Sequence, residues 1–227
     1  KLGKDEALFE HYNEMQGYLF SGSQNKDLVR FNYNDKEDMF DAVSYNKGGR
    51  ILHMLRNYIG DDAFFTALNK YLSANKFGNG SAHKLRMAFE EVSGKDLNWY
   101  FNQWYFGSGH PKLEISYAYN EATHTASAIV AQTQKGDKVF KLPINIDVWN
   151  GDTKTRHMVW AENKVDTFNF TVASKPDNIN VDADKILLAE KKDTKTLEAY
   201  AHQYFHAGNF LDRREAVNFM YDIDNAK

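Results

Sequence analysis

The sequence predicts a multidomain α and β protein in which helices come first, an antiparallel β-sandwich follows, and helices return at the end. Three observations predict this order. Apolar residues recur at helical spacing over residues 1–110 and again over 191–227, whereas they alternate at period two over 111–190. The length of 227 residues allows one large domain or two to three small ones, at roughly 100–200 residues per domain.

The composition fits a folded protein and excludes several classes. Apolar residues make up 42% of the chain, which supplies enough large side chains for a sizeable core. The net charge of −3 excludes a strongly basic nucleic-acid-binding protein, so no nucleic-acid partner is expected. No stretch reaches the roughly 20 apolar residues of a transmembrane segment. The absence of cysteine excludes disulfides, thiolate metal ligands and a cysteine nucleophile.

The N-terminus has neither an initiator methionine nor the apolar stretch of a signal peptide. We therefore expect the chain to be a piece of a longer protein. The sequence fixes neither the compartment nor the oligomeric state of that protein. The lack of cysteine, together with the habits of the family that the motif described below resembles, slightly favours a periplasmic or exported protein.

Five helices are expected in the first 110 residues, and the first of them runs over about residues 5–20. Gly60, in the left-handed conformation, and Gly94 are expected to end the second and fourth helices. Where the later helices begin, four side chains can accept hydrogen bonds from free backbone N–H groups: Ser44, Asp61, Ser81 and Asp96.

Six or seven short strands are expected between Pro111 and Glu190, and residues 140–148 show the cleanest alternation. Asn150–Gly151 is expected to form a hairpin turn, because it tolerates positive φ, and residues 134–137 form another turn. Helical spacing returns after residue 193. Two helices cannot bury a core alone, so they either pack on the sandwich or begin a further domain.

His202 and His206 are the histidines best spaced for a metal site, since residues four apart lie on one face of a helix. Their segment superficially resembles the zinc-peptidase motif His-Glu-x-x-His. However, Gln203 replaces the glutamate, and an amide cannot accept a proton from zinc-bound water. No third ligand follows at a suitable position. We therefore favour a partly exposed helix face over a weak surface metal site, and we assign no metal ligand to this chain.

Tyr45 is the candidate catalytic residue. It lies on the first turn of a predicted helix, near the positive end of the helix dipole, where a phenol can donate a hydrogen bond to a developing negative charge. Gly48 and Gly49 each cost about 1 kcal/mol relative to alanine in a helix, which indicates a close approach to the helix. The alternative is a capped helix whose first turn simply packs a tyrosine.

Residues 44–56 resemble the Tyr-x-Lys-Gly helix of the aminopeptidase N-like zinc metallopeptidases, the gluzincin aminopeptidases. The segment reads Ser-Tyr-Asn-Lys-Gly-Gly-Arg-Ile-Leu-His-Met-Leu-Arg. The resemblance is specific over about residues 36–114, looser over 1–35 and weak over 191–227; over 111–190 it is that of a sandwich domain. Further blocks match in order and spacing: Gly60–Phe65, Ser93–Leu97, Phe101–Trp104 and Gly109–Leu113.

The resemblance implies a fold and a function. Residues 1–110 would be the helical second half of a thermolysin-like catalytic domain, 111–190 a β-sandwich, and 191–227 the first helices of a C-terminal helical superhelix. The parent protein would be a zinc-dependent aminopeptidase that hydrolyses N-terminal residues from peptides, and peptide substrates would be its partners. Tyr45 would stabilise the oxyanion of the tetrahedral intermediate. Lys47 and Gly48 also match the motif and are expected to be structural.

The sequence also departs from the family pattern, and these departures bear on the expected activity. The His-Glu-x-x-His motif, the third zinc ligand and the Gly-x-Met-Glu-Asn strand of the family are missing from this sequence. We therefore expect the zinc of the parent enzyme to be held outside this chain, no cofactor within the chain, and an inactive isolated chain. No substrate-binding residue can be named. The alternative is a non-catalytic peptide-binding or scaffolding module from a zinc-less relative.

Overall fold

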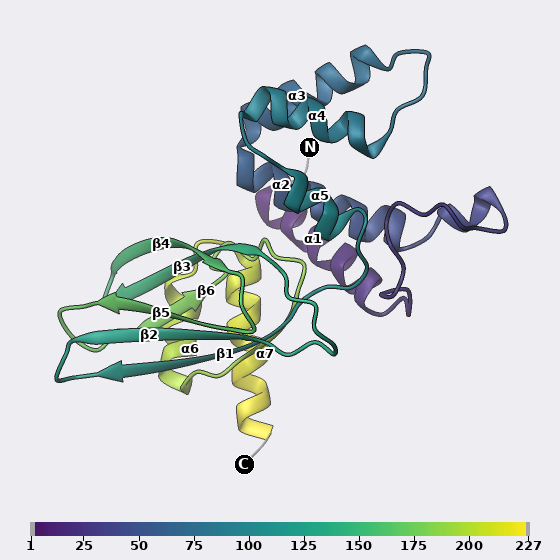
Figure 1. Cartoon of the computed structure of the whole chain (residues 1–227). Helices are drawn as coiled ribbons and strands as arrows, with labels where there is room; N and C mark the ends of the chain where they lie inside the picture. Colours follow the sequence, from purple (N-terminus) through teal and green to yellow (C-terminus); the bar gives the residue numbers. More distant parts are fainter. Residues whose placement is uncertain (1–2, 226–227) are drawn as a thin grey trace. The chain divides into compact units, whose positions relative to one another are not determined.

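The computed structural model describes residues 3–225, which fall into two compact units (Figure 1). Residues 13–109 form a helical unit. The residues before 13 and after 109 together form the other, which we call the sandwich unit. Helix α1, Lys4–Leu19, contributes residues to both. Among the described residues, no helix is long and apolar enough to span a membrane.

The helical unit is held together by α2, α4 and α5. The side chains of Ile51, Leu55, Phe89 and Trp104 are fully buried in its core. The buried hydroxyl of Tyr100 donates a hydrogen bond to the carbonyl of Ile51 at 2.5 Å, and so satisfies a polar group inside the core. Figure 1 shows α3 and α4 side by side as a helical hairpin. After α1 the elements are the 3₁₀ turn η1 (Lys36–Met39), the π-helical turn η2 (Val43–Lys47), α2 (Gly48–Ile59), α3 (Asp61–Ala74), α4 (Ala82–Ser93) and α5 (Asn98–Trp104).

Three of the predicted helix-end residues are confirmed. The Ser81 hydroxyl accepts a hydrogen bond from the amide of Lys84 at 3.2 Å, where α4 begins. Gly94 ends the same helix in the left-handed conformation, with φ 68° and ψ 11°. The Asp96 carboxylate accepts from the amide of Asn98 at 2.8 Å, at the first residue of α5. These local signals could be identified from sequence because they need no distant partner.

Gly60 ends α2 as predicted, but the conformation expected for Gly60 and the cap expected at Asp61 are wrong. Asp61 does not cap α3. Its carboxylate instead accepts two hydrogen bonds from the Arg56 guanidinium, at 2.8 and 2.6 Å. Gly60 has a positive φ of 89° but a ψ of 157°, so it lies outside the left-handed helical region. The chain therefore turns sharply at Gly60, and α3 starts directly after α2.

Within the described residues, the sandwich unit contains seven strands in two sheets. Six lie inside the predicted span from Pro111 to Glu190, and β7 extends beyond it to Asp193. One sheet has the order β5-β2-β1-β7, and the other has the order β4-β3-β6. The antiparallel prediction is wrong for one pair. β1 and β7 run parallel, from Lys112 opposite Glu190 to Ile115 opposite Asp193. The strands are β1 (Lys112–Asn120), β2 (Thr125–Gln132), β3 (Leu142–Asn150), β4 (Thr153–Ala161), β5 (Val165–Thr171), β6 (Asn178–Val181) and β7 (Glu190–Asp193).

Alternating side chains fill the space between the two sheets. Leu113 and Ile115 of β1 and Leu142 and Ile144 of β3 are buried in the expected period of two, and all four are at most 2% exposed. The β3–β4 turn is tight, and Gly151 has a φ of 55° as the sequence indicated. The helices thus end before residue 110, and strands begin at Lys112, as predicted.

Helices α6 (Leu197–His206) and α7 (Phe210–Asn225) belong to the same compact unit as the strands. α6 packs on β6, and α7 packs on α6. The first turns of α1 also belong to this unit. The Phe9 and Phe210 rings pack edge to face, with their centres 6.0 Å apart. The Arg214 guanidinium lies 4.2 Å from the centre of the Tyr12 ring. Packing on the sandwich, one of the two options left open by the sequence, is observed.

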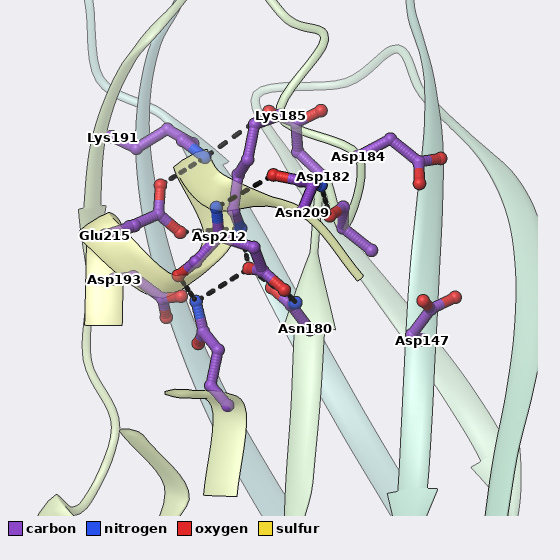
Figure 2. A network of polar contacts seen from close by, with 12 residues as sticks. Asp147, Asn180, Asp182, Asp184, Lys185, Lys191, Asp193, Asn209, Asp212 and Glu215 are labelled. Atoms are coloured by element: carbon purple, nitrogen blue, oxygen red, sulfur yellow. Dashed lines mark hydrogen bonds and ion pairs between the residues drawn. The ribbon is translucent and has the colours of Figure 1, made fainter. Parts of the chain in front are cut away.

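A buried network of charges fixes α6 and α7 to the strands (Figure 2). At its centre is Lys185, in the loop after β6. Its ammonium donates to Asn180 at 3.0 Å and pairs with Asp212 at 3.0 Å and Glu215 at 2.6 Å, both on α7. Lys191 bridges Glu215 and Asp182 at 2.7 and 3.3 Å. The Lys185 side chain is only 5% exposed.

The network keeps its members charged although they are buried. Burial disfavours the charge on Lys185, but the carboxylates of Glu215, Asp212 and Asp182 outweigh it and raise the pKa of Lys185. Burial likewise acts to raise the pKa of Glu215, and the ammonium groups of Lys185 and Lys191 lower it below its usual value. Removal of one partner would therefore leave an uncompensated buried charge.

We predict that Lys185→Met strongly destabilises the sandwich unit, by about 3–5 kcal/mol, because Asp212 and Glu215 lose their shared cation. Denaturant unfolding monitored by circular dichroism measures this change. Lys192→Met is the matched control: its side chain is 74% exposed and lies 3.6 Å from Glu114, so its effect should stay within about 0.5 kcal/mol. Equal stability of the two variants would contradict the prediction.

Candidate functional site

Tyr45 lies on an unusual turn of helix. The turn η2 is π-helical, and the amide of Lys47 reaches back five residues to the carbonyl of Ala42 at 2.9 Å. Single π-helical turns are rare and occur often at functional sites. They widen the helix locally, and α2 follows from Gly48 in regular form.

The Tyr45 side chain is 62% exposed, so its hydroxyl is open to a ligand. Its ring lies 6.1 Å from that of Phe40, which is 65% exposed, and the two rings are tilted by 35°. In the described part of the chain, no group forms a hydrogen bond with the Tyr45 hydroxyl. Within the described residues, the Tyr45 ring is therefore not packed in the core of the helical unit.

Asp41 caps the turn that carries Tyr45. Its Oδ1 accepts hydrogen bonds from the amides of Val43 and Ser44 at 3.1 and 2.9 Å. The predicted cap at Ser44 is therefore wrong: the helix starts one residue before Ser44, which lies inside η2. The Ser44 hydroxyl instead accepts from the guanidinium of Arg30 at 3.2 Å.

Arg30 completes this support by an ion pair. Its Nη1 donates to Asp41 Oδ2 at 2.7 Å, and both side chains are less than one-fifth exposed. Partial burial acts to raise the pKa of Asp41, but hydrogen bonds from Arg30 and the Ser44 amide, with the charge of Arg30, outweigh it and lower this pKa to about 2. The carboxylate thus stays ionised and holds the start of the helix in place. We refer to Arg30, Asp41 and Ser44 as the cap cluster.

Lys47 anchors the other end of η2. Its side chain is fully buried, and its Nζ donates to the carbonyl of Gly107 at 2.9 Å. This contact joins η2 to the segment that follows α5, which fits the structural role expected for Lys47. The ammonium lies on the inner side of the turn, whereas the Tyr45 ring lies on the exposed side.

Close contact with a neighbouring element does not account for the two glycines at the start of α2. A Cβ at Gly48 would lie 3.6 Å from Leu28 Cδ1, and one at Gly49 would lie 3.7 Å from Glu14 Oε2, which are ordinary contacts. The close approach occurs at Gly17 on α1, where a Cβ would lie 2.8 Å from Asn46 Nδ2. The glycine that lets α1 approach η2 is thus one that the sequence did not single out.

The described residues offer no zinc site. No group of three or more histidine or acidic side chains within residues 3–225 is arranged to hold a metal ion. The residues present therefore do not fit a zinc ion, and no catalytic step is assigned to a metal in this chain. The chemistry that the site itself can supply is hydrogen-bond donation from the exposed Tyr45 phenol.

His202 and His206 do not simply form an exposed face of α6, because both side chains contact the β3–β4 turn. Their rings stack at 3.9 Å and cover the β3–β4 turn: His202 Nε2 lies 3.0 Å from the carbonyl oxygen of Gly151, and His206 Nε2 lies 2.8 Å from Asp152 Oδ1. Hydrogen bonds to the His202 carbonyl and to Asp152 raise the pKa of His206. The pair thus fastens α6 to the hairpin.

Sequence reasoning found Tyr45 but missed Arg30 and Asp41. Asp41 could have been found, because an aspartate three residues before a serine is an equally good cap, and the choice between the two depends on where the helix begins. No sequence pattern indicated Arg30, because 11 residues separate it from Asp41 and the segment between them has no regular secondary-structure period.

Comparisons with known proteins find similarity over the segment that carries Tyr45. Residues 7–104 match the sequence profile of the peptidase family M1 domain. A probable M1 family aminopeptidase 1 from Encephalitozoon cuniculi is 24% identical over 151 residues, which cover 65% of this chain and 17% of that protein. Aminopeptidase N from Lactococcus lactis is 26% identical over 141 residues, which cover 61% of this chain and 16% of that protein.

A solved structure shows the same fold. The crystal structure of Legionella pneumophila aminopeptidase A in complex with aspartic acid matches 97% of this chain with a TM-score of 0.77, at 17% sequence identity. This chain covers 27% of that one, and it spans less than a fifth of the curated relatives reported above. The helix of Tyr45 lies inside residues 7–104, so this part of the chain is similar to the peptidase family M1 domain, and the match to the Legionella structure extends over the sandwich as well.

Proposed function

We propose that the chain is part of a zinc-dependent aminopeptidase that hydrolyses N-terminal residues from peptides. The aminopeptidase names of its relatives and the M1 match support this activity. Because the chain spans less than a fifth of those relatives, the activity is that of a longer protein. In this proposal the zinc is held by residues outside these 227, and the isolated chain is inactive.

The proposed domain architecture follows from the similarity to M1 aminopeptidases. Residues 1–110 are the helical second half of a thermolysin-like catalytic domain, and 111–190 are the β-sandwich. Residues 191–227 begin a C-terminal helical superhelix. The succession of helices, strands and helices supports this division.

Within that enzyme, Tyr45 is the catalytic residue that this chain supplies. The observation that supports this role is its exposed side chain, whose hydroxyl forms no hydrogen bond within the described residues. When a peptide bond is attacked, the carbonyl oxygen gains negative charge, and a phenol that donates to it stabilises the transition state more than the ground state. The cap cluster acts as positioning support, since it fixes the first turn of the helix that carries the phenol.

We predict that Tyr45→Phe in the whole enzyme lowers kcat about 100- to 1000-fold and changes KM far less, because one donor to the oxyanion is lost. The melting temperature should not change, since the hydroxyl makes no hydrogen bond within the described residues. Tyr33→Phe is the control: Tyr33 is 52% exposed in the same unit, and its kinetics should match the wild type. Unchanged kcat in Tyr45→Phe would remove Tyr45 from the active site.

The isolated chain should hydrolyse no aminoacyl-nitroanilide, with or without added zinc, because it carries the oxyanion donor but no assigned metal ligand or general base. An absorbance assay on highly purified chain tests this expectation. Reproducible turnover that zinc restores and a chelator abolishes would show that the chain holds a complete site.

The Asp41 carboxylate should make the start of the Tyr45 helix acid-sensitive. Its folded pKa of about 2 lies below that of an unfolded aspartate, about 4, so its contribution of about 2 kcal/mol is complete above pH 4 and is lost as the pH falls towards 2. Hydrogen exchange measured by NMR at the Tyr45 and Asn46 amides reports this loss.

At pH 6, Asp41→Asn should speed exchange at the same amides about tenfold or more, because the ion pair with Arg30 is lost. Asp27→Asn is the matched control, since no hydrogen bond or ion pair of the Asp27 side chain is found in the described chain. Equal exchange in the two variants would show that Asp41 does not hold the turn.

A further inference from the structure

The outer edge of β1 is paired over only half of its length. The amide of Thr194 donates to the carbonyl of Ile115 at 2.9 Å, and there the β1–β7 ladder stops, because the chain turns towards α6. In a strand, the N–H and C=O of every second residue point to the same side. The backbone N–H and C=O groups of Tyr117 and Tyr119 therefore point to the same side of β1 as those of Ile115, beyond the end of β7. No strand among the described residues pairs with β1 on this side at Tyr117 and Tyr119.

A cleft of about 850 Å³ opens along this unpaired edge. One wall is β1 from Tyr117 to Tyr119, a second is the segment from Lys175 to Ile179 at the start of β6, and the third is the start of α6. All three belong to the sandwich unit. The cleft carries two amines and two carboxylates in its lining, from Lys175, Lys195, Asp177 and Glu198, so its charges balance.

Asn178 lies in this lining with an unsatisfied amide. It is 3% exposed, and neither its Oδ1 nor its Nδ2 has a hydrogen-bond partner. Asn180, two residues later on the same face of β6, is the natural comparison. Its amide donates to Asp212 at 2.9 Å and accepts from Lys185 at 3.0 Å in the buried network of Figure 2. A buried amide without partners is costly, so its presence beside a cleft indicates a ligand that supplies both a donor and an acceptor.

We propose that this cleft binds an extended, uncharged peptide segment of a partner protein, which adds to β1 where β7 ends. A peptide strand presents N–H and C=O groups at the spacing of the free groups of Tyr117 and Tyr119, as in other cases of strand addition. A peptide group also offers Asn178 the acceptor and donor that it lacks. The balanced charge of the lining favours neutral side chains. This site is separate from Tyr45 and does not depend on the peptidase activity.

The test uses the 227-residue chain and a fluorescein-labelled heptapeptide of alternating threonine and valine, acetylated and amidated at its ends. Fluorescence anisotropy should show saturable binding with a Kd at or below about 1 mM. The same peptide with alternate backbone nitrogens methylated should bind at least tenfold more weakly, because it cannot donate to the β1 edge. Equal binding of the two peptides, or no saturable binding of the first, would overturn the proposal.

Two variants then locate the site. Tyr119→Pro removes one free-edge N–H, which an edge position tolerates, and should weaken binding about tenfold, whereas Tyr119→Phe should not. Asn178→Leu should weaken binding to a similar extent and yet raise the melting temperature, because an unsatisfied amide is removed. A higher melting temperature with unchanged binding would overturn the role of Asn178. Dimerisation of the chain that the heptapeptide does not reverse would assign the edge to a second copy and overturn the proposed partner.

Discussion

The Asp41 carboxylate determines where the helix of Tyr45 begins, and much of the helical unit follows from that start. With two amides bound to Asp41, the next turn opens into the π-helical form, which places Lys47 on the inside and Tyr45 on the outside. Lys47 then reaches the Gly107 carbonyl, and α2 delivers Ile51 and Leu55 to the core. An ion pair that is less than one-fifth exposed thus fixes both the packing of the unit and the exposure of its catalytic candidate.

The sandwich unit depends on charge in another way. Its helices are not held by apolar contacts alone, because Lys185 brings carboxylates of α7 to the loop that follows β6. Such buried pairs contribute modestly to net stability compared with an apolar substitute, but they specify one arrangement, since any shift of α7 would separate the charges. The orientation of α6 above the cleft depends on this arrangement, because Gln203 of α6 donates to Asp212 at 2.9 Å within the same network.

Much of the fold could be predicted from sequence, because helix and strand periodicities are local properties. The helices, the hairpin at Gly151 and the caps at Ser81 and Gly94 needed no knowledge of distant partners. β7 could not be recognised in the same way: all four of its residues are charged, and it is a strand because β1 offers it an edge. The cap cluster shows the same limit at the site. The motif identifies Tyr45. Arg30, however, lies beyond a loop, and whether Asp41 or Ser44 caps the helix depends on contacts with Arg30.

The parallel ladder between β1 and β7 also has a mechanical consequence. β1 is the strand by which the chain enters the sandwich, and β7 is the one by which it leaves. Tension between residues 111 and 194 would pull the two strands in opposite directions along their length. The four residue pairs of the ladder would then be loaded in shear together, not opened one after another like a zipper. Such a ladder resists tension applied between residues 111 and 194 more strongly than a ladder whose pairs open in turn.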